Sequence, residues 1–163
     1  MKRNVLATLL ALTAGLAGLP ASGHADVKRG EYLAMIMDCG GCHTPGIMLG
    51  KPDFARSLSG GDVGFQIPGL GVFFPPNLTP DDATGLGKWS KADIIKAVTK
   101  GERPDGRMLA PAMPWHSYGR LTAKDADALA GYLKSLKPIS NKVPAISGPN
   151  EKPGGLYLTV AQP

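Results

Sequence analysis

The sequence predicts a mainly α protein built from short helices joined by long loops. Three short stretches combine helix-like spacing of apolar residues with helix start or stop signals. The segment 44–88 has no clear periodicity and is rich in glycine and proline. The two cysteines of the chain lie three positions apart, in the motif Cys39-Gly-Gly-Cys42-His43. These three observations define the expected architecture: short helices, one long loop segment and a cysteine motif near the start of the domain.

The N-terminus is typical of a secretory signal peptide. Lys2 and Arg3 precede an apolar run of about 15 residues, and small residues follow it up to Ala25. The run is shorter than the roughly 18 apolar residues that span a bilayer, which disfavours the alternative of an uncleaved membrane anchor. We therefore expect a signal peptide over 1–25, export to the periplasm, and no stable membrane span after cleavage.

The charge balance argues against a nucleic-acid partner. The chain has 18 basic and 13 acidic residues, and losing Lys2 and Arg3 leaves 16 against 13, a formal charge of +3. The charges are scattered, without basic runs interleaved with aromatic residues. The length fits one domain, expected over 26–138, followed by an extension over 139–163.

The first expected helix covers 28–38 and leads directly into the cysteine motif. Its apolar residues at helix-like spacing are Tyr32, Leu33, Ile36 and Met37. The segment 44–88 is too long for a structureless loop in a compact domain unless it has a function, and wrapping a flat cofactor is such a function. Its candidate lining residues are Phe65, Ile67, Leu70, Val72, Phe73 and Phe74.

A second helix is expected to begin after Ser90. Ser90 and Asp93 have the spacing of a capping box, and Gly101 is well placed to end the helix. Trp89, just before the cap, has two interpretations. It is either a staple residue that packs on the helix start, or a donor of its indole N–H to a haem propionate.

The third expected helix covers 123–136, with Thr122 as its cap and Pro138 as its stop. The extension that follows is rich in proline, glycine and lysine and contains one β-like run, from Leu156 to Val160. It is either an ordered strap over the domain or a segment that binds a partner.

Three chemistries compete for the motif CGGCH: a redox-active dithiol, half of a zinc site, and covalent attachment of haem. The βαβ pattern that would accompany a thioredoxin-like dithiol is missing around Cys39. Zinc would need Cys39, Cys42, His43 and His116, and neighbours such as Cys42 and His43 seldom both ligate one tetrahedral metal. The order C-x-x-C-H favours haem attachment. We expect one covalently attached haem c, with Cys39 and Cys42 as thioether links and His43 as the proximal iron ligand.

A sixth iron ligand must approach from the face opposite His43. Met113 lies far enough along the chain for the intervening segments to circle the ring, and Pro114 keeps it in extended geometry. Met108 and His116 compete with it, and Met48 is a weaker candidate close to the attachment site. Residue patterns alone leave these alternatives open.

Residues 28–138 resemble class I cytochromes c and, more narrowly, the cytochrome c subunits and domains of bacterial periplasmic alcohol, aldehyde and related dehydrogenases. The segments that carry the resemblance are RGEYL (29–33), DCGGCHT (38–44), PNLTPD (76–81), TGLGKWS (84–90), PDGR (104–107), AMPW (112–115), SY (117–118) and YLKSL (132–136). Subunits of that family often carry three such domains, whereas this chain carries one.

The resemblance implies a class I cytochrome c fold wrapped around one haem, with the first and last helices crossing where Tyr132 packs over Gly30. It favours Met113, in the Met-Pro position of the family, as the distal iron ligand. It also places Asn77, Thr79 and Trp89 near the haem.

These observations lead to the expectation of a periplasmic monohaem electron carrier and not an enzyme. A periplasmic dehydrogenase would be the electron donor, and an oxidase or another cytochrome the acceptor. The protein would act either as a free shuttle or as the electron-transfer subunit of a dehydrogenase complex. The alternative is a haem enzyme or gas-binding protein with an open sixth iron position, for which His116 is the one candidate distal base in the expected mature chain.

Overall fold

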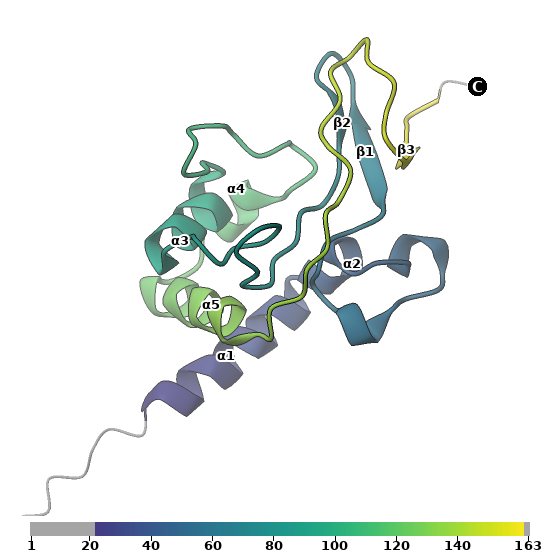
Figure 1. Ribbon diagram of the computed structural model, residues 1–163. Coiled ribbons are helices and arrows are strands. Elements are labelled where there is room, and N and C mark those ends of the chain that lie inside the picture. Colours follow the sequence, from purple (N-terminus) through teal and green to yellow (C-terminus); the bar gives the residue numbers. More distant parts are fainter. Residues whose placement is uncertain (1–21, 162–163) are drawn as a thin grey trace, which may run out of the picture.

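The computed structural model describes residues 22–161, so most of the predicted signal peptide lies outside the described residues (Figure 1). In chain order the elements are α1 (Ser22–Ile36), α2 (Cys39–His43), the 3-10 turns η1 (Ile47–Leu49) and η2 (Phe54–Arg56), β1 (Val63–Ile67), β2 (Gly71–Phe73), α3 (Lys91–Lys100), α4 (Trp115–Tyr118), α5 (Ala123–Ser135) and β3 (Leu156–Leu158). Helices predominate, as predicted. The first helix starts earlier than predicted and runs through the expected cleavage point after Ala25.

Helices α1 and α5 cross at close range. A Cβ atom at Gly30 would overlap the carbonyl oxygen of Ala128 and lie 2.6 Å from Cβ of Tyr132. Only glycine therefore permits this approach, and the predicted contact between Gly30 and Tyr132 is confirmed. The largest apolar cluster among the described residues lies at this crossing and joins α1, α3 and α5. Its buried members from these helices include Leu33, Ile94, Leu129 and Leu133.

The predicted helix caps are confirmed. The Ser90 hydroxyl oxygen accepts from the Asp93 N–H (3.1 Å) while the Asp93 carboxylate accepts from the Ser90 N–H (2.9 Å), which is the reciprocal capping box at the start of α3. Gly101 ends that helix in the left-handed conformation at φ 71°. Thr122 caps α5 by accepting from the Asp125 N–H, and α5 ends one residue before the predicted position.

The expectation of an irregular segment over 44–88 was wrong in its middle part, where β1 and β2 form an antiparallel hairpin. Phe65 pairs with Phe73, and Gly69 takes φ 76° in the turn. The strands are only 5 and 3 residues long and contain glycine, so the alternation of Val63, Phe65 and Ile67 in β1 is too short to stand out, and only the Pro68-Gly69 pair signalled the turn. Of the candidate lining residues, Val72 and Phe74 are buried, Leu70 is exposed, and the others are half-buried.

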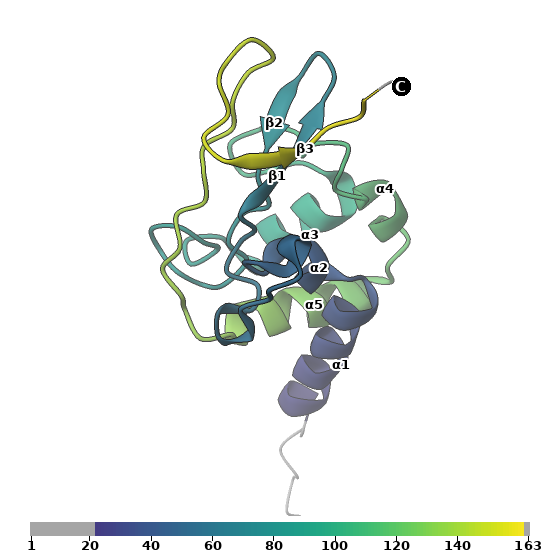
Figure 2. The ribbon, with the colours of Figure 1, turned by 90° about the vertical axis from the view of Figure 1, so that its right-hand side faces the viewer.

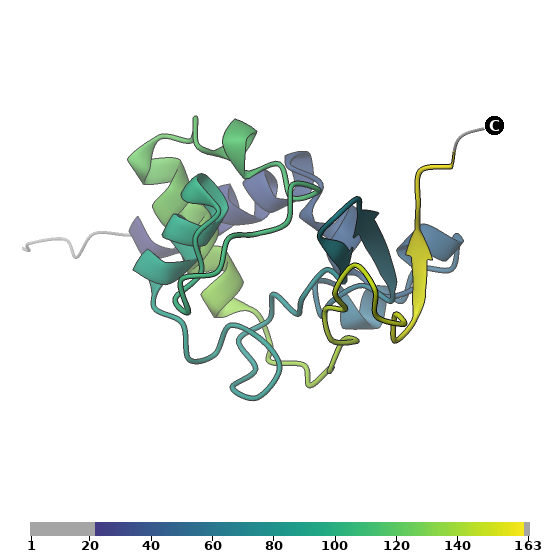
Figure 3. The ribbon, with the colours of Figure 1, turned by 90° about the horizontal axis from the view of Figure 1, so that it is seen from above.

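The last part of the chain is an ordered strap, which we define as residues 139–155. It runs from the end of α5 along the outside of the molecule to the sheet (Figures 1 and 2). Ser147 forms a β-bridge with Val72, and β3 then pairs in parallel with β1, giving the strand order β2-β1-β3. Seen from above, helices α1, α3, α4 and α5 lie on one side and the sheet on the other, and the strap connects the two (Figure 3). Within residues 22–161, no helix has the length and apolarity needed to cross a membrane.

Candidate haem-binding site

The cysteine motif forms the short helix α2, and a left-handed residue separates it from α1. Asp38 has φ 53° and ψ 38°, a conformation that ends α1 and turns the chain into α2. The two glycines of the motif have different surroundings. A Cβ atom at Gly41 would overlap the Asp38 carboxylate, whereas one at Gly40 would meet only the Thr44 hydroxyl at 3.6 Å. A side chain at position 41 would therefore have to displace the Asp38 carboxylate.

The His43 imidazole is buried and has one defined hydrogen bond. Its Nδ1 lies 2.7 Å from the carbonyl oxygen of Pro76, and the side chain is 6% exposed. Because a carbonyl can only accept, Nδ1 carries the proton, and Nε2 keeps a lone pair. Burial lowers the pKa of His43, which favours the neutral imidazole. A neutral histidine held in this tautomer is the form that ligates a metal ion.

Both thiols of the motif are free and lie on α2, one turn apart. Burial, assisted by the negative charge of Asp38, raises the pKa of Cys39 to about 11 and also raises the pKa of Cys42. Both sulfurs are therefore protonated at neutral pH. Tyr118 is held near them by a 2.6 Å hydrogen bond from its hydroxyl to the Met37 carbonyl, and burial raises its pKa to about 12.

Asn77 and Thr79 form a buried polar cluster next to Pro76. The Asn77 side-chain oxygen accepts from the Thr79 N–H (2.9 Å) and from the Thr79 hydroxyl (2.7 Å). The Asn77 amide donates to the Ile139 carbonyl (2.7 Å) and to the Thr84 hydroxyl oxygen (3.0 Å). Asn77 thus fixes the segment that presents the Pro76 carbonyl to His43. The predicted proximity of Asn77 and Thr79 to a haem stays a prediction.

The candidates for the second iron ligand differ in burial. Met113 is half-buried, whereas Met108, Met48 and His116 are exposed, and the His116 ring stacks on Trp115 with ring centroids 3.4 Å apart. Met113 lies just before α4, and α4 is tied to Met37 by the Tyr118 hydroxyl. The structure therefore brings Cys39, Cys42 and His43 together on one helix and places Met113 on a separate segment anchored near that helix.

The available donors fit an attached haem better than zinc. Two thiols and one imidazole lie on α2, and the best-buried methionine among the distal candidates precedes α4. Within residues 22–161, no three His, Cys, Asp or Glu side chains gather so that they could hold a metal ion. A tetrahedral zinc set is therefore missing from the described part of the chain.

Trp89 packs on the core next to the start of α3. It lies against the apolar cluster that contains Ile94, which agrees with the staple interpretation. The Arg103 guanidinium lies over its ring, 4.9 Å from the centroid, so the loop after α3 also contacts the indole. The alternative role, donation to a haem propionate, stays a prediction.

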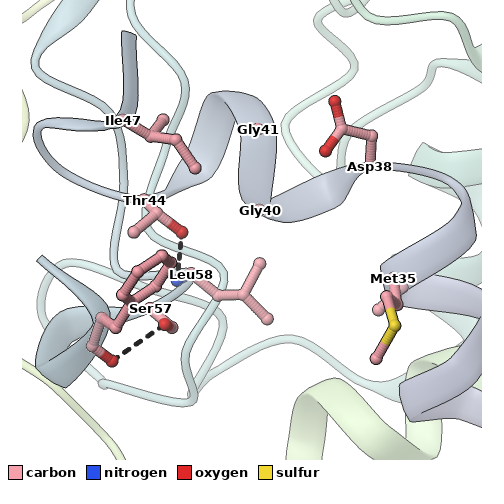
Figure 4. A pocket seen from close by; sticks show the side chains of 10 residues that line it. Met35, Asp38, Gly40, Gly41, Thr44, Ile47, Ser57 and Leu58 are labelled. Atoms are coloured by element: carbon pink, nitrogen blue, oxygen red, sulfur yellow. Dashed lines mark hydrogen bonds between the residues drawn. The ribbon is translucent and has the colours of Figure 1, made fainter. Parts of the chain in front are cut away.

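A cavity of about 220 Å³ lies on the glycine side of α2 (Figure 4). Its lining residues are Ala34, Met35, Asp38, Gly40, Gly41, Thr44, Ile47, Phe54, Ser57 and Leu58. The predicted haem-binding residues are not among them. Met35 and Phe54 are more than two-thirds exposed beside it, so this face of the motif is apolar and open to solvent.

The fold and the motif together define a domain of the cytochrome type, and comparison with known proteins specifies the family. The cytochrome c family model matches residues 27–137. The chain belongs to the cytochrome c family, whose members bind haem c covalently and transfer electrons. The predicted class I cytochrome c fold is thereby confirmed.

The similar proteins are subunits of bacterial dehydrogenases. The chain is 37% identical to the cytochrome c subunit of a quinone alcohol dehydrogenase from Gluconobacter oxydans (strain 621H), over 86% of this chain and 28% of the relative. It is 36% identical to the fructose dehydrogenase cytochrome subunit of Gluconobacter japonicus, over 77% of this chain and 24% of the relative. It is 38% identical to the gluconate 2-dehydrogenase cytochrome c subunit of Pantoea cypripedii, over 86% of this chain and 30% of the relative. The chain thus spans less than a third of the length of these relatives, and the predicted resemblance to dehydrogenase cytochrome subunits is confirmed.

Three residues near His43 and the thiols escaped the sequence analysis as contributors to the site. Pro76 acts through its backbone carbonyl, which no residue pattern reveals. Tyr118 and Asn141 act across 81 and 82 residues of chain, on Met37 and Ser59 respectively. The position of Tyr118 shortly after the Met-Pro segment was the one sequence feature that pointed to this residue. No sequence feature pointed to Asn141.

Proposed function

We propose that this chain is a periplasmic monohaem c-type cytochrome that carries single electrons from a dehydrogenase towards a terminal oxidase or another cytochrome. The observation that carries the proposal is the state of His43. Its buried imidazole has Nδ1 2.7 Å from the Pro76 carbonyl oxygen, which leaves Nε2 available to ligate a metal in the neutral ring, on the same helix as both thiols. When bound, haem c supplies an iron that cycles between Fe(III) and Fe(II).

The residues of the chain have distinct roles in this proposal. Cys39 and Cys42 hold the haem through two thioethers, so that a small domain does not lose its cofactor. His43 is the proximal ligand, kept neutral and in one tautomer by burial and by Pro76. Met113 is the distal ligand, and a thioether in that position raises the reduction potential relative to a second histidine.

The dehydrogenase partner is inferred from the relatives, which are cytochrome subunits of alcohol, fructose and gluconate dehydrogenases. The chain acts either as a free shuttle or as one subunit of a complex with such a dehydrogenase. Co-purification from the native periplasm distinguishes these two forms. A dehydrogenase that remains bound through gel filtration indicates a fixed subunit.

The test of the proposed cofactor chemistry is intact mass combined with an optical spectrum. The chain is produced in a host with haem-attachment machinery and recovered from the periplasm. We expect the mass of 26–163 plus one haem, and a weak red band from Met–Fe(III) ligation. Cys39→Ala and Cys42→Ala should each leave one thioether link. A free dithiol, or a Cys39–Cys42 disulfide without haem, contradicts the proposal.

The same spectrum tests the alternative of a haem enzyme or gas binder. A high-spin spectrum that shifts strongly with carbon monoxide indicates an open sixth position and would favour that alternative. Its candidate distal base, His116, is exposed and stacked on Trp115.

A further inference from the structure

The strap after α5 enters the protein at the polar cluster beside His43. The Ile139 carbonyl accepts from the Asn77 amide (2.7 Å), and the Ile139 N–H donates to the Thr79 hydroxyl oxygen (3.1 Å). The Asn141 N–H donates to the Thr84 hydroxyl oxygen (3.0 Å). Asn77 and Thr79 are each 1% exposed, so these bonds are shielded from water. The first residues of the strap are therefore fixed to the segment that carries Pro76.

The strap also contacts a second segment next to His43. The Asn141 side-chain amide donates to the Ser59 carbonyl (2.9 Å), and Ser59 is fully buried. The next residue, Gly60, donates its N–H to the His43 carbonyl (2.8 Å). The Val143 side chain lies so close to Gly60 that a Cβ atom there would come within 2.5 Å of it.

These two contacts converge on the proximal histidine. The Pro76 carbonyl accepts from the His43 ring, and the Gly60 N–H donates to the His43 carbonyl. The strap bonds the neighbour of each of these residues: it bonds Asn77, next to Pro76, and Ser59, next to Gly60. The Asn141 side chain makes the contact with Ser59, and its N–H donates to the Thr84 hydroxyl oxygen, which also accepts from the Asn77 amide. All strap residues lie outside 27–137, the part of the chain that matches the family model.

We propose that Asn141 is a positioning residue for His43, and that the strap residues 139–141 close a clamp which holds the proximal imidazole against the Pro76 carbonyl. The proposal rests on the proposed function for the identity of His43 as an iron ligand. A firm hydrogen bond from Nδ1 increases the electron donation of the imidazole to the iron and favours Fe(III). Loosening the clamp should therefore raise the reduction potential.

The experiment compares Asn141→Ala with Asn150→Ala in the haem-loaded protein. Asn150 is an exposed asparagine on the same strap and serves as the matched control. We expect Asn141→Ala to shift the potential upwards and to speed exchange of the His43 Nδ1 proton, followed by NMR in the reduced protein. The exchange rate of the Nδ1 proton should rise about tenfold, which corresponds to about 1.4 kcal/mol. Asn141→Asp, which keeps the size of the side chain but cannot donate to Ser59 when ionised, should speed exchange of the Nδ1 proton by at least the same factor. Its potential is not part of the comparison, because the added negative charge itself favours Fe(III).

Equal potentials and equal Nδ1 exchange in the Asn141→Ala, Asn150→Ala and wild-type proteins overturn the proposal. If the Asn141 variants do not accumulate, amide exchange in the wild type decides. In a closed clamp the N–H groups of Gly60 and Asn141 open together, so their protection agrees within about tenfold. Protection of Asn141 more than about a hundredfold below that of Gly60 overturns the proposal. This last measurement does not require haem, so it stands even if the mass spectrum contradicts the proposed function.

Discussion

The segments that carry His43 and Met113 are built in different ways. His43 is almost fully buried, and both its ring and its backbone carbonyl are hydrogen-bonded to residues distant in sequence. Met113 is half-buried, and its backbone bonds are local: its N–H donates to the Ala110 carbonyl (2.9 Å), and its carbonyl accepts from the Trp115 N–H (2.8 Å). Met108 and His116, on the same segment, are exposed.

The difference indicates that the fold holds His43, the proposed proximal ligand, more firmly than Met113, the proposed distal ligand. Long-range bonds at His43 can open only when several distant segments separate, whereas the turns around Met113 can open on their own. A rigid proximal side and a locally held distal side would let the distal bond to iron break without unfolding of the protein. Substitutions on the two sides, taken in order of decreasing effect, test this contrast.

Replacing the proximal histidine should have the largest effect. His43→Ala removes the imidazole and leaves an unfilled space beside Pro76, so we expect loss of the low-spin haem spectrum and reduced recovery of folded protein. Optical spectra and haem stain after periplasmic extraction measure both effects. His116→Ala is the matched control, because that ring is exposed, and it should leave the spectrum unchanged. A native spectrum in His43→Ala together with an altered spectrum in His116→Ala would reject His43 as the proximal ligand.

Replacing Met113 should alter the iron without unfolding the protein. Met113→Ala should abolish the Met–iron band, lower the potential and allow carbon monoxide to bind, because a soft ligand is lost at a residue whose own backbone bonds are local. Spectra and redox titration measure these changes. Met108→Ala, on the same segment, should leave the iron six-coordinate. A native spectrum in Met113→Ala together with loss of the Met–iron band in Met108→Ala would mean that Met108, and not Met113, ligates the iron.

Replacing Thr79 tests the stability of the proximal side. Thr79→Val keeps the shape of the side chain but removes the hydroxyl that donates to Asn77 and accepts from Ile139. Because the partners are buried, the free energy of unfolding should fall by about 1–3 kcal/mol. Denaturant unfolding followed by circular dichroism measures it. Thr159→Val, at an exposed position, should change stability much less. Equal stabilities of the two variants would indicate that the polar cluster contributes nothing.

The smallest expected effect concerns acid stability. The Asp81 carboxylate accepts from the hydroxyl and the N–H of Thr84, both at 2.7 Å, and these bonds lower its pKa from the ordinary value of 3.8. The stabilisation is therefore complete above pH 3.8 and is lost as the pH falls through the lower folded value. In Asp81→Asn the difference from wild type should be constant at neutral pH and shrink below about pH 4. Thermal melts at several pH values measure it, and a constant difference down to pH 2 would contradict the assignment.

The elements that the sequence predicted are those whose signals are local. Ser90 with Asp93, Gly101 and Thr122 mark helix ends within three or four residues of the groups they bond, so spacing alone located α3 and α5. The β1–β2 hairpin escaped prediction because its strands are short and partly glycine, leaving little periodicity to detect.

The residues of the candidate site differ in the same respect: some have a local signal in the sequence and others do not. Cys39, Cys42 and His43 form a contiguous motif and could be proposed from the residues alone. The Pro76 carbonyl, the Asn77 cluster and the Asn141 contact depend on which distant segments fold together, and no local pattern encodes that. The distal side lies between these cases, because the Met113-Pro114 pair is visible in the sequence whereas the anchor from Tyr118 to Met37 is not.

The hydrogen bonds of the strap also order events during synthesis. Asn141 reaches Ser59 across 82 residues, and Asn77 reaches Ile139 across 62. A chain that emerges N-terminus first exposes the CGGCH helix long before the residues that close around His43 are available. Contacts of such separation form late, since the intervening chain must first be brought together. The cysteines are therefore accessible to other molecules early in folding. This accessibility ends when Asn141 binds Ser59 and the position of His43 is fixed.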